Sequence, residues 1–203
     1  MSRIALRKAD LAKNPVEQFR AWFVDAAKLE GRDATAMLVA TADASGRPSA
    51  RVMLMKAFDE EGFVFFTNYE SRKSRELTEN PRAMLLFFWE DLGRQIRISG
   101  RVERVSEEES DKYFLSRPRA SQLGAWASPQ SEVIPNREHL ERRLKAVEER
   151  FGDGPIARPP NWGGYRLVPE EFEFWLGGVD RLHDRFRYLR APEGTWAIER
   201  LAP

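Results

Sequence analysis

The segment Arg181–Arg185 combines side chains that can bind an anion or move a proton. With strict strand alternation, one face of this segment carries Arg181, His183, Arg185 and Arg187. Cations stacked along one face repel one another, and a structure tolerates them best when anions or carboxylates lie opposite. An exposed edge strand protected by charge shows the same pattern. The segment therefore indicates either an anion site or a charged sheet edge.

Two more cations, Arg51 and Lys56, stand at the ends of an otherwise apolar run. Strict alternation places them on opposite faces, where they would serve different anions unless a bulge intervenes. Cations at the ends of a strand also commonly extend their charged heads into water. We interpret the pair as a hint of two phosphate groups rather than one.

Two other places offer donors for a phosphate. Ser71, Arg72 and Lys73 stand at the predicted start of a helix, where free backbone N–H groups favour an anion. Tyr113 and Arg117 are four residues apart, and Ser121 follows shortly after. Taken alone, each pattern is more simply explained by ordinary structure, the first by a solvated helix start and the second by a plain surface helix.

The elements that must position these residues are short strands with helices at the margins. The pattern predicts strands over residues 36–42, 49–58, 63–67, 82–89, 95–105, 164–176, 182–190 and 195–200. It predicts helices over residues 15–30, 71–79 and 106–116, a short one after Pro118, and one from the cap Asn136 to Phe151. We expect a mainly β (α+β) fold, a small barrel with added helices. Residues 14–203 would form a single domain after a flexible segment 1–13.

The amino-acid composition argues against several classes of function. The chain has 203 residues with 33 basic and 32 acidic side chains, so its net charge of +1 provides no bulk attraction for nucleic acid. It has no cysteine and two histidines, which leaves little material for a metal site. Without an apolar run of membrane length, we expect a soluble cytoplasmic protein. The residues alone indicate a binder of one or two phosphorylated small molecules.

Taken together and in order, the motifs resemble the pyridoxamine 5′-phosphate oxidase family over residues 10–203. The resemblance rests on Arg51–Lys56, Phe66-Thr67-Asn68, Ser71-Arg72-Lys73, Ser116–Trp126, Gln130-Ser131, Glu173-Phe174-Trp175 and Arg181–Phe186. It implies an FMN-binding split β-barrel with peripheral helices, which works as a homodimer with the flavin at the subunit interface. It also implies which positions form the site. The FMN set would be Arg51, Val52, Met53, Leu54, Met55, Lys56, Phe66, Thr67, Arg72, Lys73, Gln95, Gln130, Ser131, Trp175 and Arg185. The substrate phosphate set would be Lys56, Tyr113, Arg117 and Ser121, with Arg181 and His183 over the pyridine ring as the catalytic pair.

The implied reaction is oxidation of pyridoxine 5′-phosphate or pyridoxamine 5′-phosphate to pyridoxal 5′-phosphate by dioxygen. It would release hydrogen peroxide, and ammonia from the amine. Phe66 replaces a tyrosine of many members, and the chain lacks an N-terminal stretch that folds over the substrate in some of them. Two alternatives stay open: a related flavin oxidase acting on another ring system, and a protein that holds FMN or pyridoxal phosphate without turnover.

Overall fold

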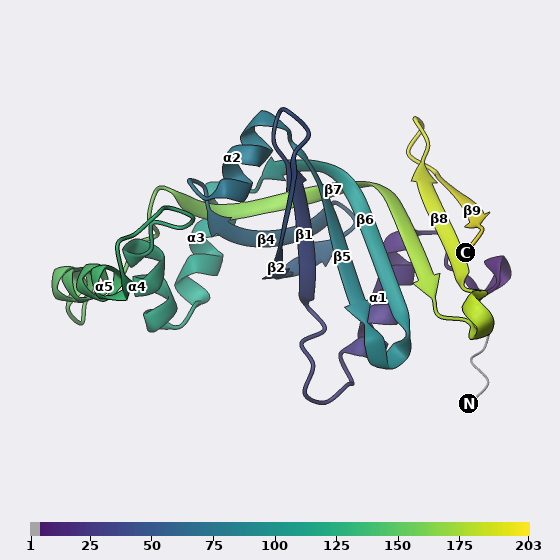
Figure 1. The fold of residues 1–203 in the computed structure, drawn as a ribbon, viewed down its shortest axis with the longest axis horizontal. Coiled ribbons are helices and arrows are strands. Elements are labelled where there is room, and N and C mark those ends of the chain that lie inside the picture. Colours follow the sequence, from purple (N-terminus) through teal and green to yellow (C-terminus); the bar gives the residue numbers. More distant parts are fainter. Residues whose placement is uncertain (1–4) are drawn as a thin grey trace.

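A computed structural model describes residues 5–203 as a curled antiparallel sheet with helices at its margins (Figure 1). The strands are β1 (Ala36–Ala42), β2 (Pro48–Leu54), β3 (Ala57–Asp59), β4 (Gly62–Asn68), β5 (Arg82–Trp89), β6 (Arg94–Arg104), β7 (Trp162–Leu176), β8 (Asp184–Arg190) and β9 (Trp196–Leu201). The helices are α1 (Pro15–Ala26), α2 (Arg72–Glu79), α3 (Glu107–Ser116), α4 (Arg119–Ala127) and α5 (Arg137–Phe151), and η1 (Lys8–Asp10), η2 (Glu90–Leu92) and η3 (Val179–Arg181) are short 3₁₀ turns.

Backbone pairing curls the sheet into a partly open barrel. The strand order is β2-β1-β5-β6-β7-β4-β3, and β8 and β9 extend from β7. At the corner between β2 and β3, the N–H of Lys56 donates to the carbonyl of Val64 on β4 at 2.8 Å. This bond extends the β3–β4 pairing, and residues 55 and 56 connect β2 directly to β3, so the chain itself joins the two ends of the strand order. The predicted mainly β split barrel is confirmed.

Strand β7 divides one of its edges between two partners. It pairs with β6 along its length, with β4 over residues 162–167, and with β8 over residues 171–176. A register shift at Ser99 and Gly100 lies opposite the point where the partner changes. One strand therefore belongs to the barrel at its start and to the C-terminal hairpin at its end.

Helix α1 supplies the centre of the barrel core. The side chain of Asn14 accepts from the N–H of Val16, and Pro15 occupies the first helical position. Phe19 is fully buried and packs edge-on against Phe58 and Phe63 at ring distances of 4.9 Å. Burying one such ring stabilises the fold by about 1.5–3 kcal/mol.

Three predicted boundaries were wrong. Helix α1 ends at Ala26 rather than Glu30, and Gly31, at φ 72°, lies beyond it. The run 49–58 is interrupted at residues 55–56 by the barrel corner. The strand predicted over 182–190 begins at Asp184, because the N–H groups of Leu182 and His183 donate within the preceding turn, to the carbonyls of Val179 and Arg181.

The two ends of the chain meet on the C-terminal hairpin. The N–H of Leu6 donates to Asp184, and Nζ of Lys8 donates to the carbonyl of Ile198 at 2.8 Å. The segment predicted to be flexible thus contacts β8 and β9 from Leu6 onward, while its residues 1–4 lie outside the described part of the chain.

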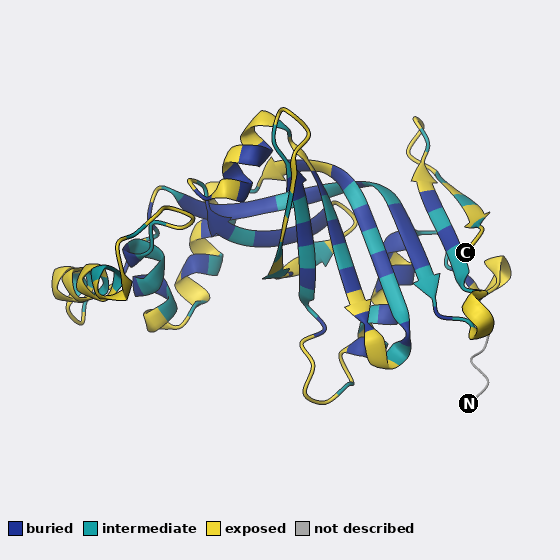
Figure 2. Ribbon diagram, in the orientation of Figure 1, coloured by how far each residue is buried: buried dark blue, intermediate teal, exposed yellow. Residues whose placement is uncertain are grey.

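Helices α3–α5 gather at the opposite end of the molecule from this hairpin (Figure 1). Phe114, Leu123, Ile156 and Trp162 form a second, smaller core there. Helix α5 buries no residue completely, and its ribbon in Figure 2 is mostly exposed. Among the helices of residues 5–203, none combines the length and apolar character needed to cross a membrane.

Two buried tyrosines should respond differently to loss of the hydroxyl. Tyr188 donates to the carbonyl of Ala12 at 2.8 Å, whereas the hydroxyl of Tyr165 has no hydrogen-bond partner within residues 5–203. We expect Tyr188→Phe to cost about 1 kcal/mol of stability and roughly 2–4 °C in Tm. Tyr165→Phe should leave Tm unchanged or raise it. Calorimetry on both variants measures the difference, and equal losses would contradict this assignment.

Candidate functional site

A cavity of about 700 Å³ opens between the β2 edge of the barrel and helices α3 and α4. Within the described chain its lining includes four cations, Arg51, Lys56, Lys73 and Arg117, and no acidic side chain. The remaining lining is Val52, Met53, Leu54, Phe66, Thr67, Asn68, Tyr113, Pro118, Ser121, Gly124, Ala125, Ser128, Gln130 and Trp162. A concave site with this charge is suited to anions.

Lys73 is the most deeply buried of the four cations, with 6% of its surface exposed. Its Nζ donates to three neutral oxygens, those of Thr67, Ser71 and Gln130, at 3.0–3.1 Å. It forms no ion pair within residues 5–203. Burial, reinforced by the nearby charge of Arg51, lowers the pKa of Lys73 to about 8. A buried ammonium held only by neutral acceptors is a favourable place for a phosphate.

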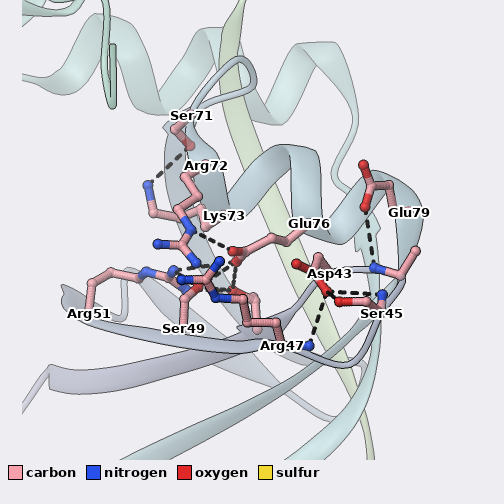
Figure 3. A network of polar contacts seen from close by, with 12 residues as sticks. Asp43, Ser45, Arg47, Ser49, Arg51, Ser71, Arg72, Lys73, Glu76 and Glu79 are labelled. Carbon is pink, nitrogen blue, oxygen red and sulfur yellow. Dashed lines mark hydrogen bonds and ion pairs between the residues drawn. The ribbon is translucent and has the colours of Figure 1, made fainter. Parts of the chain in front are cut away.

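Arg51 is held by a buried carboxylate that the sequence prediction missed. Figure 3 shows Glu76 of α2 pointing toward Arg51 and Arg72. Its Oε1 accepts from Arg72 at 2.8 Å, and its Oε2 lies 3.5 Å from Arg51. Thr41 and Ser49 donate to Oε2 at 2.5 and 2.6 Å, and each also accepts a bond from the Arg51 guanidinium. The only signal in the sequence was the four-residue spacing of Arg72 and Glu76 on one helix.

Glu76 stays ionised although it is almost fully buried. Burial alone would raise its pKa, but hydrogen bonds from Ser49, Thr41 and Arg72 and the charge of Arg51 lower the pKa to about 2. Arg72 is therefore turned toward Glu76 and does not line the cavity, nor does Ser71. Of the predicted helix-start cluster, Lys73 alone lines the cavity.

The structure brings Tyr113, Arg117 and Ser121 together on the opposite wall. The Arg117 guanidinium lies over the Trp162 ring at 4.7 Å, and its Nη1 is buried without a hydrogen-bond partner in residues 5–203. Phe66 stacks on Tyr113 with ring centroids 4.0 Å apart. A buried donor without a partner is costly unless a ligand satisfies it, and an oxyanion would do so.

The alternation argument for Arg51 and Lys56 was wrong, because the strand does not continue through Lys56. β2 ends at Leu54, and the corner turns Lys56 to the same cavity as Arg51. Met55, between them, enters the barrel core instead and is 3% exposed. Whether the two cations serve two phosphates thus no longer follows from strand alternation.

A second group of predicted residues lies on the C-terminal hairpin. Gln95, Trp175 and Arg185 occupy consecutive positions across β6, β7 and β8. Buried Glu173 pairs with Arg185 at 2.9 Å and with Arg97. Burial opposes ionisation of Glu173, but these two arginines keep its pKa below the ordinary value.

The predicted row of cations on one strand face is only partly present. Arg187 pairs with Glu199 at 2.5 Å and Arg185 with Glu173, so carboxylates neutralise the strand part of the row. Arg181 and His183 precede the strand, in the turn after β7, and strand alternation does not apply to them. Of the other predicted positions, Ser131, at φ 73°, does not line the cavity.

The cavity and the hairpin group lie at opposite ends of β7. Trp162 at the start of this strand lines the cavity, and Trp175 near its end contacts His183 at 4.6 Å. The strand between them is roughly 40 Å long at about 3.3 Å per residue. Figure 1 places α3 and α4 and the turn before β8 at opposite ends of the molecule. A single chain does not bring the two groups together.

Comparisons with known proteins point to one family, and the matched relatives span the whole chain. A family model described as pyridoxamine 5′-phosphate oxidase matches residues 23–151. A second, described as the pyridoxine 5′-phosphate oxidase C-terminal dimerisation region, matches residues 162–203. Proteins named pyridoxine/pyridoxamine 5′-phosphate oxidase from Burkholderia mallei (strain SAVP1) and Burkholderia thailandensis are each 56% identical over 204 residues, which covers 100% of this chain and 95% of each relative.

Solved structures are similar as well. PhzG from Burkholderia lata 383, in complex with tetrahydrophenazine-1-carboxylic acid, gives a TM-score of 0.92 at 34% identity and covers 100% of this chain and 99% of its own. A pyridoxamine 5′-phosphate oxidase-related, FMN binding protein from Nostoc punctiforme PCC 73102 gives a TM-score of 0.73 at 19% identity, over 95% of this chain and 100% of its own. The second similarity concerns the fold alone.

Glu76 should stabilise the protein in a pH-dependent way. Its pKa is about 2 in the folded chain against an ordinary 4.5, so its contribution is complete above pH 4.5 and is lost as the pH falls toward 2. We expect Glu76→Gln to lower the free energy of unfolding by about 3 kcal/mol at neutral pH. Denaturant unfolding at several pH values measures this loss.

The matched control for this variant is Glu79→Gln, which changes an exposed carboxylate of the same helix. We expect it to cost less than about 0.5 kcal/mol. A loss in Glu76→Gln that stays constant down to about pH 2 would show that its carboxylate charge is not the cause.

Proposed function

The chain belongs to the pyridoxamine 5′-phosphate oxidase family, and from this premise we propose that it oxidises pyridoxine 5′-phosphate and pyridoxamine 5′-phosphate to pyridoxal 5′-phosphate. Its cofactor is FMN. Dioxygen is the final acceptor and is reduced to hydrogen peroxide. The observation that carries the proposal is the cavity itself, which combines four cations, no carboxylate among its described lining residues, and the buried, unpartnered Nη1 of Arg117.

The cavity contains two groups of hydrogen-bond donors, which supports the binding of two phosphate groups. Lys73 lies beside Arg51, and Glu76 fixes the direction of the Arg51 guanidinium. We assign this pair, with Thr67 and Gln130, to the phosphate of FMN. Tyr113, Arg117 and Ser121, together with Lys56, are assigned to the phosphate of the substrate.

FMN, when bound, accepts the hydride that leaves the exocyclic carbon of the substrate. The residues of this chain hold the two molecules and orient the substrate carbon. Phe66, Tyr113 and Trp162 form a nearly parallel stack in its wall. Such rings are suited to contact with flat, conjugated ligands.

We assign the hairpin group to the same site through the partner subunit of a homodimer. The roughly 40 Å of β7 prevent Arg181 and His183 from reaching the cavity of their own chain. The turn that carries them exposes Val179 and Leu182, at 78% and 74%, and the cavity rim exposes Val52 at 72%. Exposed apolar groups at both places are typical of a surface that another subunit covers.

A related oxidase acting on a tetrahydrophenazine carboxylic acid is the alternative, because the PhzG structure is similar over the full chain. That acid carries one carboxylate. The two groups of phosphate donors and the 56% identity with relatives named for pyridoxine and pyridoxamine phosphates favour the phosphorylated substrates.

The test offers the FMN-loaded protein pyridoxine 5′-phosphate, pyridoxamine 5′-phosphate and tetrahydrophenazine-1-carboxylic acid in air. We expect aldehyde and hydrogen peroxide from both phosphates, with ammonia from the amine. Turnover of the phenazine compound alone would assign the chain to the alternative. Bound FMN with no turnover of any of the three would indicate a binding protein.

Lys56→Ala should then raise KM for the phosphorylated substrates about tenfold, because one charge-assisted contact is lost. FMN affinity should not change. Lys112→Ala removes an exposed lysine of α3 that does not line the cavity and is the matched control. If Lys56→Ala changed FMN affinity alone, the division of the two phosphates would be wrong.

Lys73 should make FMN binding pH-dependent. The pKa of Lys73 is about 8 without ligand, and a neighbouring phosphate favours the charged form of the lysine. Below pH 8 the lysine is already charged, and its contribution to FMN affinity is fully present. Above that pH we expect the affinity to fall by up to about tenfold per pH unit. Quenching of flavin fluorescence measures it. Lys73→Gln should bind more weakly and lose this dependence, and an unchanged wild-type affinity up to about pH 9 would contradict the assignment.

Subunit mixing tests the shared site directly. We expect Arg117→Leu and Arg181→Leu homodimers to be inactive, with FMN retained in the second. In a mixed dimer one site carries both substitutions and the other carries neither. Co-expression of the two variants should therefore restore about a quarter of the wild-type activity. If each site were built from one chain, mixing would restore none.

A further inference from the structure

A row of alternating charges crosses the C-terminal half of the sheet. Its members are direct cross-strand partners on β6, β7, β8 and β9: Arg97, Glu173, Arg187 and Glu199. Opposite charges at such positions attract one another across neighbouring strands. Side chains two residues apart on a strand share a face, so the adjacent row on this face holds Gln95, Trp175 and Arg185. The charged row therefore lies directly beside positions proposed to contact FMN.

Glu173 does not pair with its direct neighbour on β8. Arg187 lies opposite it but pairs with Glu199 at 2.5 Å. Both oxygens of Glu173 instead reach diagonally to Arg185, whose Nε donates to Oε1 at 2.9 Å and whose Nη2 donates to Oε2 at 3.2 Å. Arg97 donates to Oε2 as well. With 3% of its side chain exposed, this carboxylate is committed to two guanidinium groups.

The guanidinium of Arg185 is fixed from two sides. Glu173 engages Nε and Nη2, and the carbonyl of Ala202, just beyond the end of β9, accepts from Nη1 at 2.8 Å. A guanidinium has five N–H groups, and these bonds use three of them within residues 5–203. The other two have a set direction before any ligand arrives. An arginine held in this way loses less side-chain freedom on binding, which favours affinity.

We propose that Glu173 is a positioning residue for FMN, which acts by holding the guanidinium of Arg185 in its binding direction. This inference rests on the proposed function, which assigns the hairpin group to the site of the partner subunit. The carboxylate has two effects of opposite sign on FMN affinity. Its charge partly cancels the attraction between Arg185 and an anionic cofactor, whereas its hydrogen bonds remove the cost of ordering the side chain. Because 26% of the Arg185 side chain is exposed, water screens the charge effect, and the ordering effect dominates.

A double-mutant cycle on FMN binding tests this role. The FMN dissociation constant of the full chain is measured by quenching of flavin fluorescence in wild type, Glu173→Gln, Arg185→Leu and the double variant. We expect Glu173→Gln to weaken FMN binding about fivefold. In the Arg185→Leu background the same substitution should change the affinity less than about twofold, because the residue through which Glu173 acts is absent. Glu173 keeps Arg97 as a partner in that background.

Glu173→Asp separates the direction of Arg185 from the charge of the carboxylate, and it serves if Glu173→Gln fails to fold. The shorter side chain keeps the charge but loses the diagonal reach to Arg185, so FMN binding should again weaken about fivefold. The matched control is Glu199→Gln, which removes an exposed carboxylate of the same row that pairs with Arg187. We expect the control to change FMN affinity less than about twofold.

Equal losses with and without Arg185 would show that Glu173 supports the fold in general. Wild-type or tighter FMN binding in Glu173→Gln and Glu173→Asp would show that the direction of Arg185 does not limit affinity. Either result overturns the proposal, as does an unchanged FMN affinity in Arg185→Leu. The proposed function is decided separately, by the wild-type assay for aldehyde and hydrogen peroxide with the two phosphates.

Discussion

Strand β7 is the constraint on which the arrangement of the site depends. Its first half pairs with β4 beside the cavity, and its second half pairs with β8 beside the His183 turn. A strand cannot fold back on itself, so the two groups of site residues are separated by most of its length. In the proposed homodimer, the barrel of one subunit would provide one part of the site and the hairpin of the other subunit would provide the second part.

In the cavity and in the hairpin group alike, a buried carboxylate forms ion pairs with arginine side chains. Glu76 and Glu173 are each almost fully buried, and each contacts two arginines. Either carboxylate without its arginines would be an uncompensated buried charge, so these groups fix one another's direction. Lys73 and Arg117 differ, because neither has a carboxylate partner in the described chain. Three of the four cavity cations, Lys56, Lys73 and Arg117, form no ion pair within residues 5–203, so a chain of net charge +1 still builds a cationic site.

Predictions from strand alternation were wrong at two places where the backbone departs from regular strand geometry. Alternation placed Arg51 and Lys56 on opposite faces, but the barrel corner after Leu54 turned both into one cavity. It also placed Arg181 and His183 on a strand face with Arg185, whereas positive φ at Asp180 and Arg181 puts them in a turn. Glu76 escaped notice because a helical Glu four residues after Arg72 is an ordinary surface pattern, and its burial depends on Thr41 and Ser49 of distant strands.

The sequence by itself determined the family, the mainly β class, most of the strands and the residue types proposed to bind phosphate, because these depend on local periodicity and on motifs with a set order. Tertiary structure alone decided which of those residues share a cavity and which lie at the far end of β7. It also decided the pKa of Lys73 and the contacts of Glu173 with Arg97 and Arg185. Burial and hydrogen-bond partners come from segments distant in the chain, and no local pattern encodes them.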